Sequence, residues 1–112
     1  MLAELRITPM GCEDEFARVV ADVVRLVADG DMQYEVHGMG TTVEGQIDDI
    51  LDLVRRCHEE VRRHSDRVLI EVSIDDRAGR EGELVRSVER VRELELATPV
   101  RRLATSSRRV EL

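Results

Sequence analysis

The chain of 112 residues is long enough for one small domain with a single hydrophobic core. Apolar residues make up 42% of it and aromatic residues only 2%, so the core has to be built from valine, leucine and isoleucine. The formal net charge of −7 disfavours nucleic acid as a partner, because an acidic surface repels phosphate, and no apolar run is long enough to cross a membrane.

The first predicted element is a strand over residues 2–8, where apolar and polar residues alternate. Pro9 lacks an amide donor and Gly11 permits a turn, so the prediction ends the strand there. A helix is expected over about 13–29. Three acidic residues open it, and apolar residues follow at helical spacing as far as Gly30, which suits a helix C-terminus.

A β-hairpin is predicted next, with strands over residues 33–37 and 41–45 and a turn at Gly38-Met39-Gly40. Asp48 and Asp49 then open a second helix. Its predicted apolar stripe consists of Ile47, Ile50, Leu51, Val54, His58 and Val61. On that stripe His58 is interpreted as a core histidine and not as a ligand.

The last two regular elements are a strand over 67–75 and a helix over about 81–96. Periodicity fades beyond Pro99, so the prediction divides the chain into a domain over 1–96 and a loosely ordered tail over 97–112.

This order of elements, β-α-β-β-α-β followed by a helix, predicts an α+β ferredoxin-like sandwich. Two rules constrain the topology: each β-α-β unit should cross over right-handed, and the two strands of the hairpin must be neighbours. A four-stranded antiparallel sheet in the order 4-1-3-2 satisfies both. Two helices cover one face of this sheet, and the C-terminal helix is an addition.

The uncovered face of the predicted sheet carries mainly polar side chains. They are Glu4, Arg6, Thr8, Gln33, Glu35, His37, Thr42, Glu44, Leu69, Glu71, Ser73 and Asp75. One interpretation is a solvated face whose charges pair across strands. The other is an acidic surface suited to a small cation and closed over by another subunit. Tyr34 and Thr41 have the opposite parity and face the helices, where Tyr34 is expected in the core.

Catalytic and metal-binding patterns are weak. Adjacent residues on a helix point about 100° apart, so Cys57 and His58 do not form a nucleophile–base pair. Cys12 and Cys57 have neither metal nor redox spacing, which suits a cytoplasmic protein, and no metal site is expected. An RNA-binding sheet needs aromatic residues and a basic surface, which this chain lacks.

The hairpin segment YEVHGMGTTVEG, residues 34–45, closely resembles the pattern Y-E-x-H-x-M-G-T-x-x-E-G of the small thiamine-binding proteins of the YkoF-like superfamily, long catalogued as a domain of unknown function. AELRITPMG, residues 3–11, resembles the first strand of that family and the Pro-hydrophobic-Gly sequence with which the chain leaves it. DDILDLVRRCHEEV resembles the second helix, and IEVSIDDR resembles the end of the fourth strand. The resemblance covers roughly residues 2–96.

The resemblance implies a ferredoxin-like subunit that forms homodimers and homotetramers and binds thiamine or its hydroxymethyl-pyrimidine moiety as a carrier or sensor, without an enzymatic role or a cofactor. The family pattern and the open-face geometry together give the expected ligand-binding residues. They are Glu35, His37, Met39, Gly40, Thr41, Thr42, Glu44, Thr8, Met10 and Ser73. Thr41 is expected from the resemblance, whereas Thr42 and Glu44 are expected from the open-face geometry. Gly38 departs from the family, which often has proline there.

Two alternatives remain at this point. The chain could be a structural or interaction oligomer whose hairpin motif shapes subunit contacts without a metabolite. An enzyme of thiamine metabolism is the less favoured alternative, because no nucleophile–base pair is evident.

Overall fold

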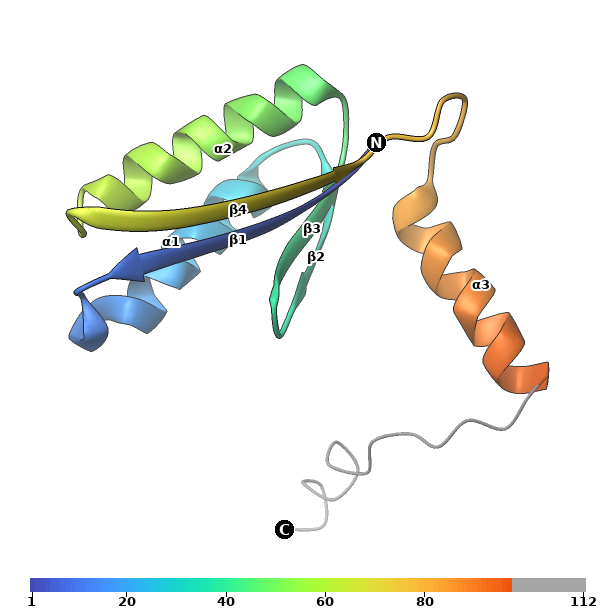
Figure 1. Cartoon of the computed structure of the whole chain (residues 1–112), viewed down its shortest axis with the longest axis horizontal. Helices are drawn as coiled ribbons and strands as arrows, with labels where there is room; N and C mark the ends of the chain where they lie inside the picture. The colour runs from blue at the N-terminus through green and yellow to red at the C-terminus, as the bar shows by residue number, and fades with distance from the viewer. Residues whose placement is uncertain (98–112) are drawn as a thin grey trace, which may run out of the picture.

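The computed structural model describes residues 1–97 and contains one four-stranded antiparallel sheet with helices beside it (Figure 1). The elements are β1 (Leu2–Met10), the 3-10 helix η1 (Glu13–Glu15), α1 (Phe16–Asp29), β2 (Gln33–His37), β3 (Gly40–Glu44), α2 (Ile47–Arg62), β4 (Arg67–Asp75) and α3 (Glu83–Ala97). The strand order β2-β3-β1-β4 confirms the predicted ferredoxin-like fold. In Figure 1, α3 extends away from the sheet and the other two helices, although its first turn contacts β3.

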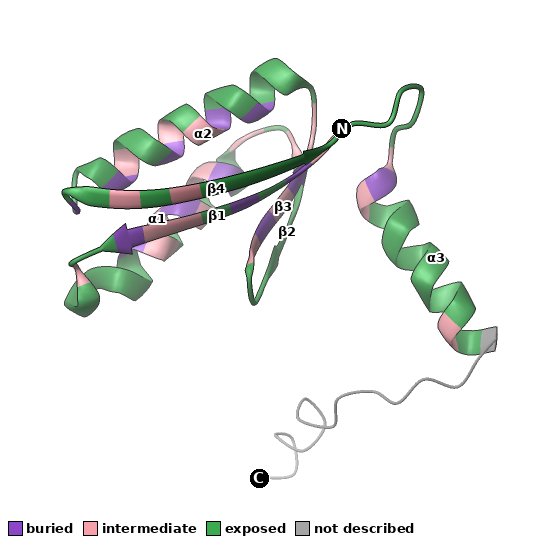
Figure 2. Cartoon of the chain, in the orientation of Figure 1, coloured by how far each residue is buried: buried purple, intermediate pink, exposed green. Residues whose placement is uncertain are grey.

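The core lies between the sheet and the paired helices α1 and α2, as the buried stretches in Figure 2 show. It is aliphatic, as predicted. Its members are Ala3, Leu5, Val19, Val23, Val27, Val43, Ile50, Leu53, Cys57 and Val61. Alternate residues of the strands and residues three or four apart on the helices supply it, because those spacings place side chains on one face.

The predicted stripe of α2 is wrong at three positions. Ile47 and Leu51 are 40% and 52% exposed and His58 is exposed, whereas Leu53 and Cys57, which the stripe left out, are buried. Successive helical residues are about 100° apart, so a helix that buries Ile50, Leu53 and Cys57 turns the neighbouring positions 51 and 58 to its flank. The interpretation of His58 as a core histidine is therefore incorrect.

β1 continues past the predicted break and ends at Met10, with Pro9 paired in register with Val68. β3 pairs with β1 only as far as Leu5, so the second half of β1 has a neighbour on one side alone. Proline is tolerated in such an edge segment because one row of amide groups needs no partner.

Tyr34 is paired with the core residue Val43 and so lies on the helix-facing side, as its parity predicts. It is nevertheless 42% exposed, because β2 is the outermost strand of the sheet. The expectation of a core tyrosine is therefore wrong.

None of the helices within residues 1–97 has the length and apolar character needed to cross a bilayer. Apart from Ala97, the predicted tail 97–112 lies outside the described residues.

Candidate functional site

A pocket of about 330 Å³ lies between the β2–β3 hairpin, α1 and the middle of β1. It exists because the pairing of β3 with β1 stops at Thr41 and Leu5, while β1 continues for five more residues along α1. Its apolar wall comes mainly from α1 and consists of Phe16, Val20, Val23, Val24 and Val27. Leu5, Ile7 and Val36 add to that wall, and the polar lining residues are Arg6, Thr8, His37 and Thr41.

The hairpin tip contains two loop residues, Gly38 and Met39, between the paired residues His37 and Gly40. Gly40 has a positive φ of 152°, and a Cβ atom on it would lie 2.5 Å from the carbonyl oxygen of Leu5. No side chain fits that separation, so glycine is required for β3 to approach β1 at the pocket edge. Thr41 follows directly and is only 8% exposed, on the helix-facing side, as its parity predicts.

His37 is held in place by groups on its own hairpin. The backbone N–H of Met39 donates to its Nδ1 at 3.4 Å, and its Nε2 lies 3.0 Å from Thr42 Oγ1. An accepting Nδ1 leaves the proton on Nε2, which then donates to the threonine hydroxyl. A carboxylate oxygen of Glu4 lies 3.7 Å from the same nitrogen. These contacts fix the shape of the turn that borders the pocket.

On the open face, a row of polar residues crosses all four strands in register. Glu35, Thr42, Glu4 and Ser73 occupy neighbouring positions of β2, β3, β1 and β4. Thr42, Glu4 and Ser73 border a separate shallow depression with Asp75. The predicted open face is therefore present. Its residues Glu4, Glu35, Thr42 and Ser73 do not line the hairpin pocket, whereas Arg6, Thr8 and His37 do.

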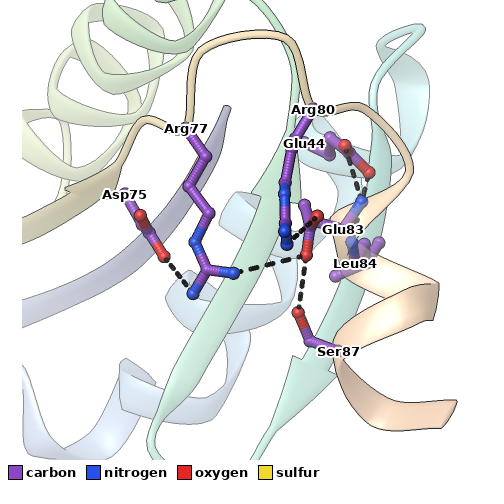
Figure 3. Close-up of polar contacts among 7 residues, drawn as sticks. All are labelled: Glu44, Asp75, Arg77, Arg80, Glu83, Leu84 and Ser87. Carbon is purple, nitrogen blue, oxygen red and sulfur yellow. Dashed lines mark hydrogen bonds and ion pairs between the residues drawn. The ribbon is translucent and has the colours of Figure 1, made fainter. Parts of the chain in front are cut away.

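Glu44 also lies at the end of β3, where it is bonded to the start of α3 (Figure 3). Its two carboxylate oxygens accept hydrogen bonds from the backbone N–H groups of Glu83 at 3.0 Å and Leu84 at 3.3 Å. A carboxylate in this position satisfies two of the free N–H groups at a helix N-terminus and interacts favourably with the helix dipole. Glu44 therefore caps α3.

The side chain of Glu83 forms the centre of a second set of contacts at the same place (Figure 3). Its carboxylate lies 3.5 Å from Arg80 and 3.8 Å from Arg77, and it accepts a hydrogen bond from Ser87 at 3.2 Å. The residue is buried, so these partners compensate for its removal from water. Together with Glu44 they fix the first turn of α3 to the sheet.

The structure brings five of the ten predicted ligand residues to the hairpin pocket: Thr8, His37, Met39, Gly40 and Thr41. Glu35, Thr42 and Ser73 lie on the open face, and Glu44 lies against α3. Met10 lies at the far end of β1, where the hydroxyl of Ser65 donates to its carbonyl group.

Sequence reasoning missed the α1 wall of the pocket, because it treated the apolar residues at helical spacing in that helix as a single packing face. The feature of the sequence that could have indicated this wall is two pairs of adjacent valines, at 19–20 and 23–24. They make the apolar stripe wider than one packing face needs. The second member of each pair, Val20 and Val24, lines the pocket.

Within residues 1–97, no Asp, Glu or Cys side chain belongs to the lining of this pocket. Arg6 and the titratable His37 are its charged or chargeable members. Glu4 and Glu35 lie on the open face. The pocket is therefore apolar on the helix side and hydrogen-bonding on the hairpin side, which suits an uncharged planar ring better than a bare cation.

The chain matches the family model described as "Thiamine-binding protein" over residues 3–92. It is 36% identical over 94 residues to a UPF0045 protein of Methanothermobacter thermautotrophicus, with 81% of this chain and 95% of the relative covered. The UPF0045 protein MJ1052 of Methanocaldococcus jannaschii is 30% identical over 94 residues, with 84% and 94% covered.

Solved structures of similar fold include the following two. The crystal structure of the Methanocaldococcus jannaschii protein superposes with a TM-score of 0.75 and 29% identity, covering 82% of this chain and 95% of that one. A Thermotoga maritima protein, provisionally described as a thiamine biosynthesis/salvage protein, gives a TM-score of 0.69. It is 24% identical, with 79% and 96% covered, and at this identity the likeness shows the fold alone.

Proposed function

Since the chain belongs to the thiamine-binding protein family, we propose that it binds a thiamine-related compound through its hydroxymethyl-pyrimidine moiety and carries or senses it without catalysing a reaction. The observation that carries this proposal is the hairpin pocket. The hairpin segment that resembles the family pattern forms one side of it, and the valines of α1 form the other.

The dimensions and lining of the pocket support a small planar ligand. Its volume of about 330 Å³ lies at the lower end of the range of small-molecule sites, roughly 300–1,000 Å³. The valines of α1 offer a flat apolar surface for a ring face, and the sulfur of Met39 is a polarizable contact. The hydroxyl of Thr41 and the backbone of the turn supply donors and acceptors for the amino group and ring nitrogens of an aminopyrimidine.

For intact thiamine, we propose that the thiazolium ring lies at the mouth of the pocket. No carboxylate among residues 1–97 lines the pocket to neutralise it, and burying an unpaired cation is costly. The net charge of −7 still attracts a cationic ligand from a distance. The pyrimidine moiety therefore supplies most of the affinity in this proposal.

A binding role is favoured over catalysis by the surroundings of His37 in the pocket and of Cys57 in the core. His37 faces Thr42 and Glu4, not a nucleophile. Burial raises the pKa of the Cys57 thiol to about 11, so this cysteine stays protonated near neutral pH and is a poor nucleophile.

We further propose that the protein acts in the cytosol as a homodimer that pairs into a homotetramer. The outer strands β2 and β4 leave sheet edges open for pairing with a second copy. Apolar side chains are exposed at these edges and along α3: Val36, Val72, Ile74, Val85, Val88, Val91 and Leu94. Association would bury them. Light scattering at micromolar concentration that shows only a 12.8 kDa species would contradict this assembly.

Titration calorimetry with hydroxymethyl-pyrimidine, thiamine and the thiazole moiety alone tests the ligand. We expect the pyrimidine and thiamine to bind with affinities within about tenfold of each other, about 1.4 kcal/mol, and the thiazole to bind much more weakly. If the thiazole alone binds as well as thiamine, the assignment of the pocket is wrong. If none of the three binds, the oligomer without a metabolite becomes the better description.

A further inference from the structure

A second group of polar side chains lies between α1 and α2, outside the hairpin pocket. Asp22 of α1, Glu60 of α2 and His64 just beyond α2 each offer one ligand atom, and these three atoms lie within 4.8 Å of one another. We propose that they bind a divalent transition-metal ion such as zinc. This site goes beyond the proposed ligand binding and does not depend on it.

The placement of the three residues follows from the packing of the two helices. Asp22 precedes the core residue Val23 of α1, and Glu60 precedes the core residue Val61 of α2. Each therefore lies at the flank of the buried seam, where one helix faces the other. Their side chains are only 25% and 23% exposed, which is low for carboxylates on surface helices.

Glu60 and His64 form a pair with helical i, i+4 spacing. The backbone N–H of His64 donates to the carbonyl of Val61 at 2.9 Å, so the chain continues to coil past the end of α2. The Nε2 atom of His64 lies 3.4 Å from a carboxylate oxygen of Glu60. Two ligands that share a tetrahedral ion at about 2.1 Å are roughly 3.4 Å apart, so this pair already has the required separation.

The other ring nitrogen of His64 faces a carboxylate that is not in the triad. Its Nδ1 lies 3.9 Å from Glu15. In metal sites the ligating imidazole typically directs its second nitrogen toward a carboxylate, which sets the tautomer and orients the ring. Glu15 would have this orienting role and leave Nε2 free to bind the ion. This arrangement distinguishes the site from a simple gathering of acids.

The donor set determines the class of ion. One imidazole nitrogen with two carboxylate oxygens suits zinc and similar transition metals, whereas calcium and magnesium prefer oxygen ligands alone. Three protein ligands leave positions for water. The ligand atom of Asp22 lies within 4.8 Å of the other two, and on metal binding it would move to the roughly 3.4 Å separation of ligands that share one ion.

The two arginines that form ion pairs with Asp22 and Glu60 would compete only weakly with a metal ion for these carboxylates. Arg25 lies 3.7 Å from Asp22, and Arg63 lies 3.7 Å from Glu60. Their side chains are 72% and 73% exposed, and exposed ion pairs of this kind contribute little. A dication between Asp22 and Glu60 would therefore displace them easily.

Thermal unfolding of the tag-free protein with and without zinc chloride tests the site. At ten times the dissociation constant we expect the unfolding midpoint to rise by roughly 5 °C or more. His64→Gln and Asp22→Asn are expected to abolish this rise. The matched control is His58→Gln, because His58 is exposed on α2 and does not belong to the triad, so this variant should keep the full rise.

Cobalt(II) provides an independent measurement through its visible absorption. We expect d–d bands of a nitrogen and oxygen site, lost in His64→Gln, without the thiolate charge-transfer band that binding to Cys12 or Cys57 would give. The proposal is overturned if millimolar zinc leaves the midpoint unchanged. It is also overturned if His64→Gln responds to zinc as the unaltered chain does, or if cobalt shows the thiolate band.

Discussion

The side chain of Glu44 accepts a hydrogen bond from the backbone N–H of Glu83, 3.0 Å away and 39 residues later in the chain. A second bond, from Leu84, completes the contact at 3.3 Å. A glutamate at the end of the hairpin motif therefore determines where the C-terminal helix begins. The same five-residue strand carries Thr41 in the pocket and Glu44 at the helix, so it links the candidate ligand site to the placement of α3.

We expect Glu44→Gln to lower the free energy of unfolding by roughly 1 kcal/mol, because glutamine keeps one acceptor oxygen and loses the charge that favours the helix N-terminus. The unfolding midpoint should fall by about 4–8 °C. Circular dichroism measures the midpoint, and amide exchange at Leu84 reports the lost cap. Glu35→Gln is the control, because Glu35 lies on the open face of β2.

The same variant should bind hydroxymethyl-pyrimidine with nearly unchanged affinity, since Glu44 does not line the pocket. An unchanged midpoint together with an affinity loss of tenfold or more would show that Glu44 is a ligand residue and not a helix cap.

Gly38 in the hairpin tip and Gly40 at the start of β3 should respond oppositely to substitution by alanine. At Gly40 a Cβ atom would lie 2.5 Å from the Leu5 carbonyl oxygen, so Gly40→Ala should destabilise the protein by about 1–3 kcal/mol and distort the pocket edge. At Gly38 a Cβ atom would meet nothing within 4 Å and φ is not positive. Gly38→Ala should therefore stabilise by up to about 1 kcal/mol, because it restricts the unfolded chain. Urea unfolding of both variants measures this, and equal effects would contradict the close approach at Leu5.

Cys57 should make stability depend on alkaline pH. Burial raises the pKa of its thiol from 9.0 to about 11 in the folded protein, so the folded state holds this proton more tightly than the unfolded state. The contribution of this protonated thiol to the free energy of unfolding is complete below pH 9. It is lost as pH rises from 9 to 11, by roughly 2–3 kcal/mol in total.

Urea midpoints measured between pH 7.5 and 10.5 check this dependence. Cys57→Ala should be less stable at pH 7.5, because it leaves a small cavity, yet it should lose less stability on going to pH 10.5. Cys12→Ser is the matched control and should follow the unaltered chain. Parallel curves for all three proteins would exclude Cys57 as the source.

The alternation and helical spacing of the sequence predict the sheet well. The strands over 33–37 and 67–75 have the predicted bounds, and the strand order is as predicted. Local patterns are sufficient here because one face of each strand must meet the helices. The errors at Tyr34 and His58 have another origin. Alternation or helical spacing identifies the side a residue faces, but not whether a neighbouring element covers that side.

The candidate site was predictable only in part. The hairpin residues lie in one short segment whose pattern is visible, and five of the predicted ligand residues do line the pocket. The α1 wall, the cap on Glu83 and the proximity of Asp22 to His64 each involve residues far apart in the chain. Such contacts depend on how packed elements meet, which the periodicity of a single element does not contain.

Substitution of the two threonines of the hairpin distinguishes between two candidate ligand sites, the pocket and the open face. Thr41 is buried in the pocket lining, whereas Thr42 lies on the open face with its hydroxyl 3.0 Å from His37. Thr41→Val keeps nearly the same shape and removes only the hydroxyl, so a hydrogen bond to the pyrimidine would be lost. We expect the affinity for hydroxymethyl-pyrimidine to fall about fivefold to tenfold, corresponding to roughly 1 kcal/mol.

Thr42→Val is the matched control and should bind with an affinity within about twofold of the unaltered chain, although it loses the contact to His37. Calorimetry measures both variants, and unfolding midpoints show that both remain folded. If Thr42→Val weakens binding and Thr41→Val does not, the ligand lies on the open face beside Glu4 and Glu35. Binding would then depend on their charges and would weaken strongly with added salt.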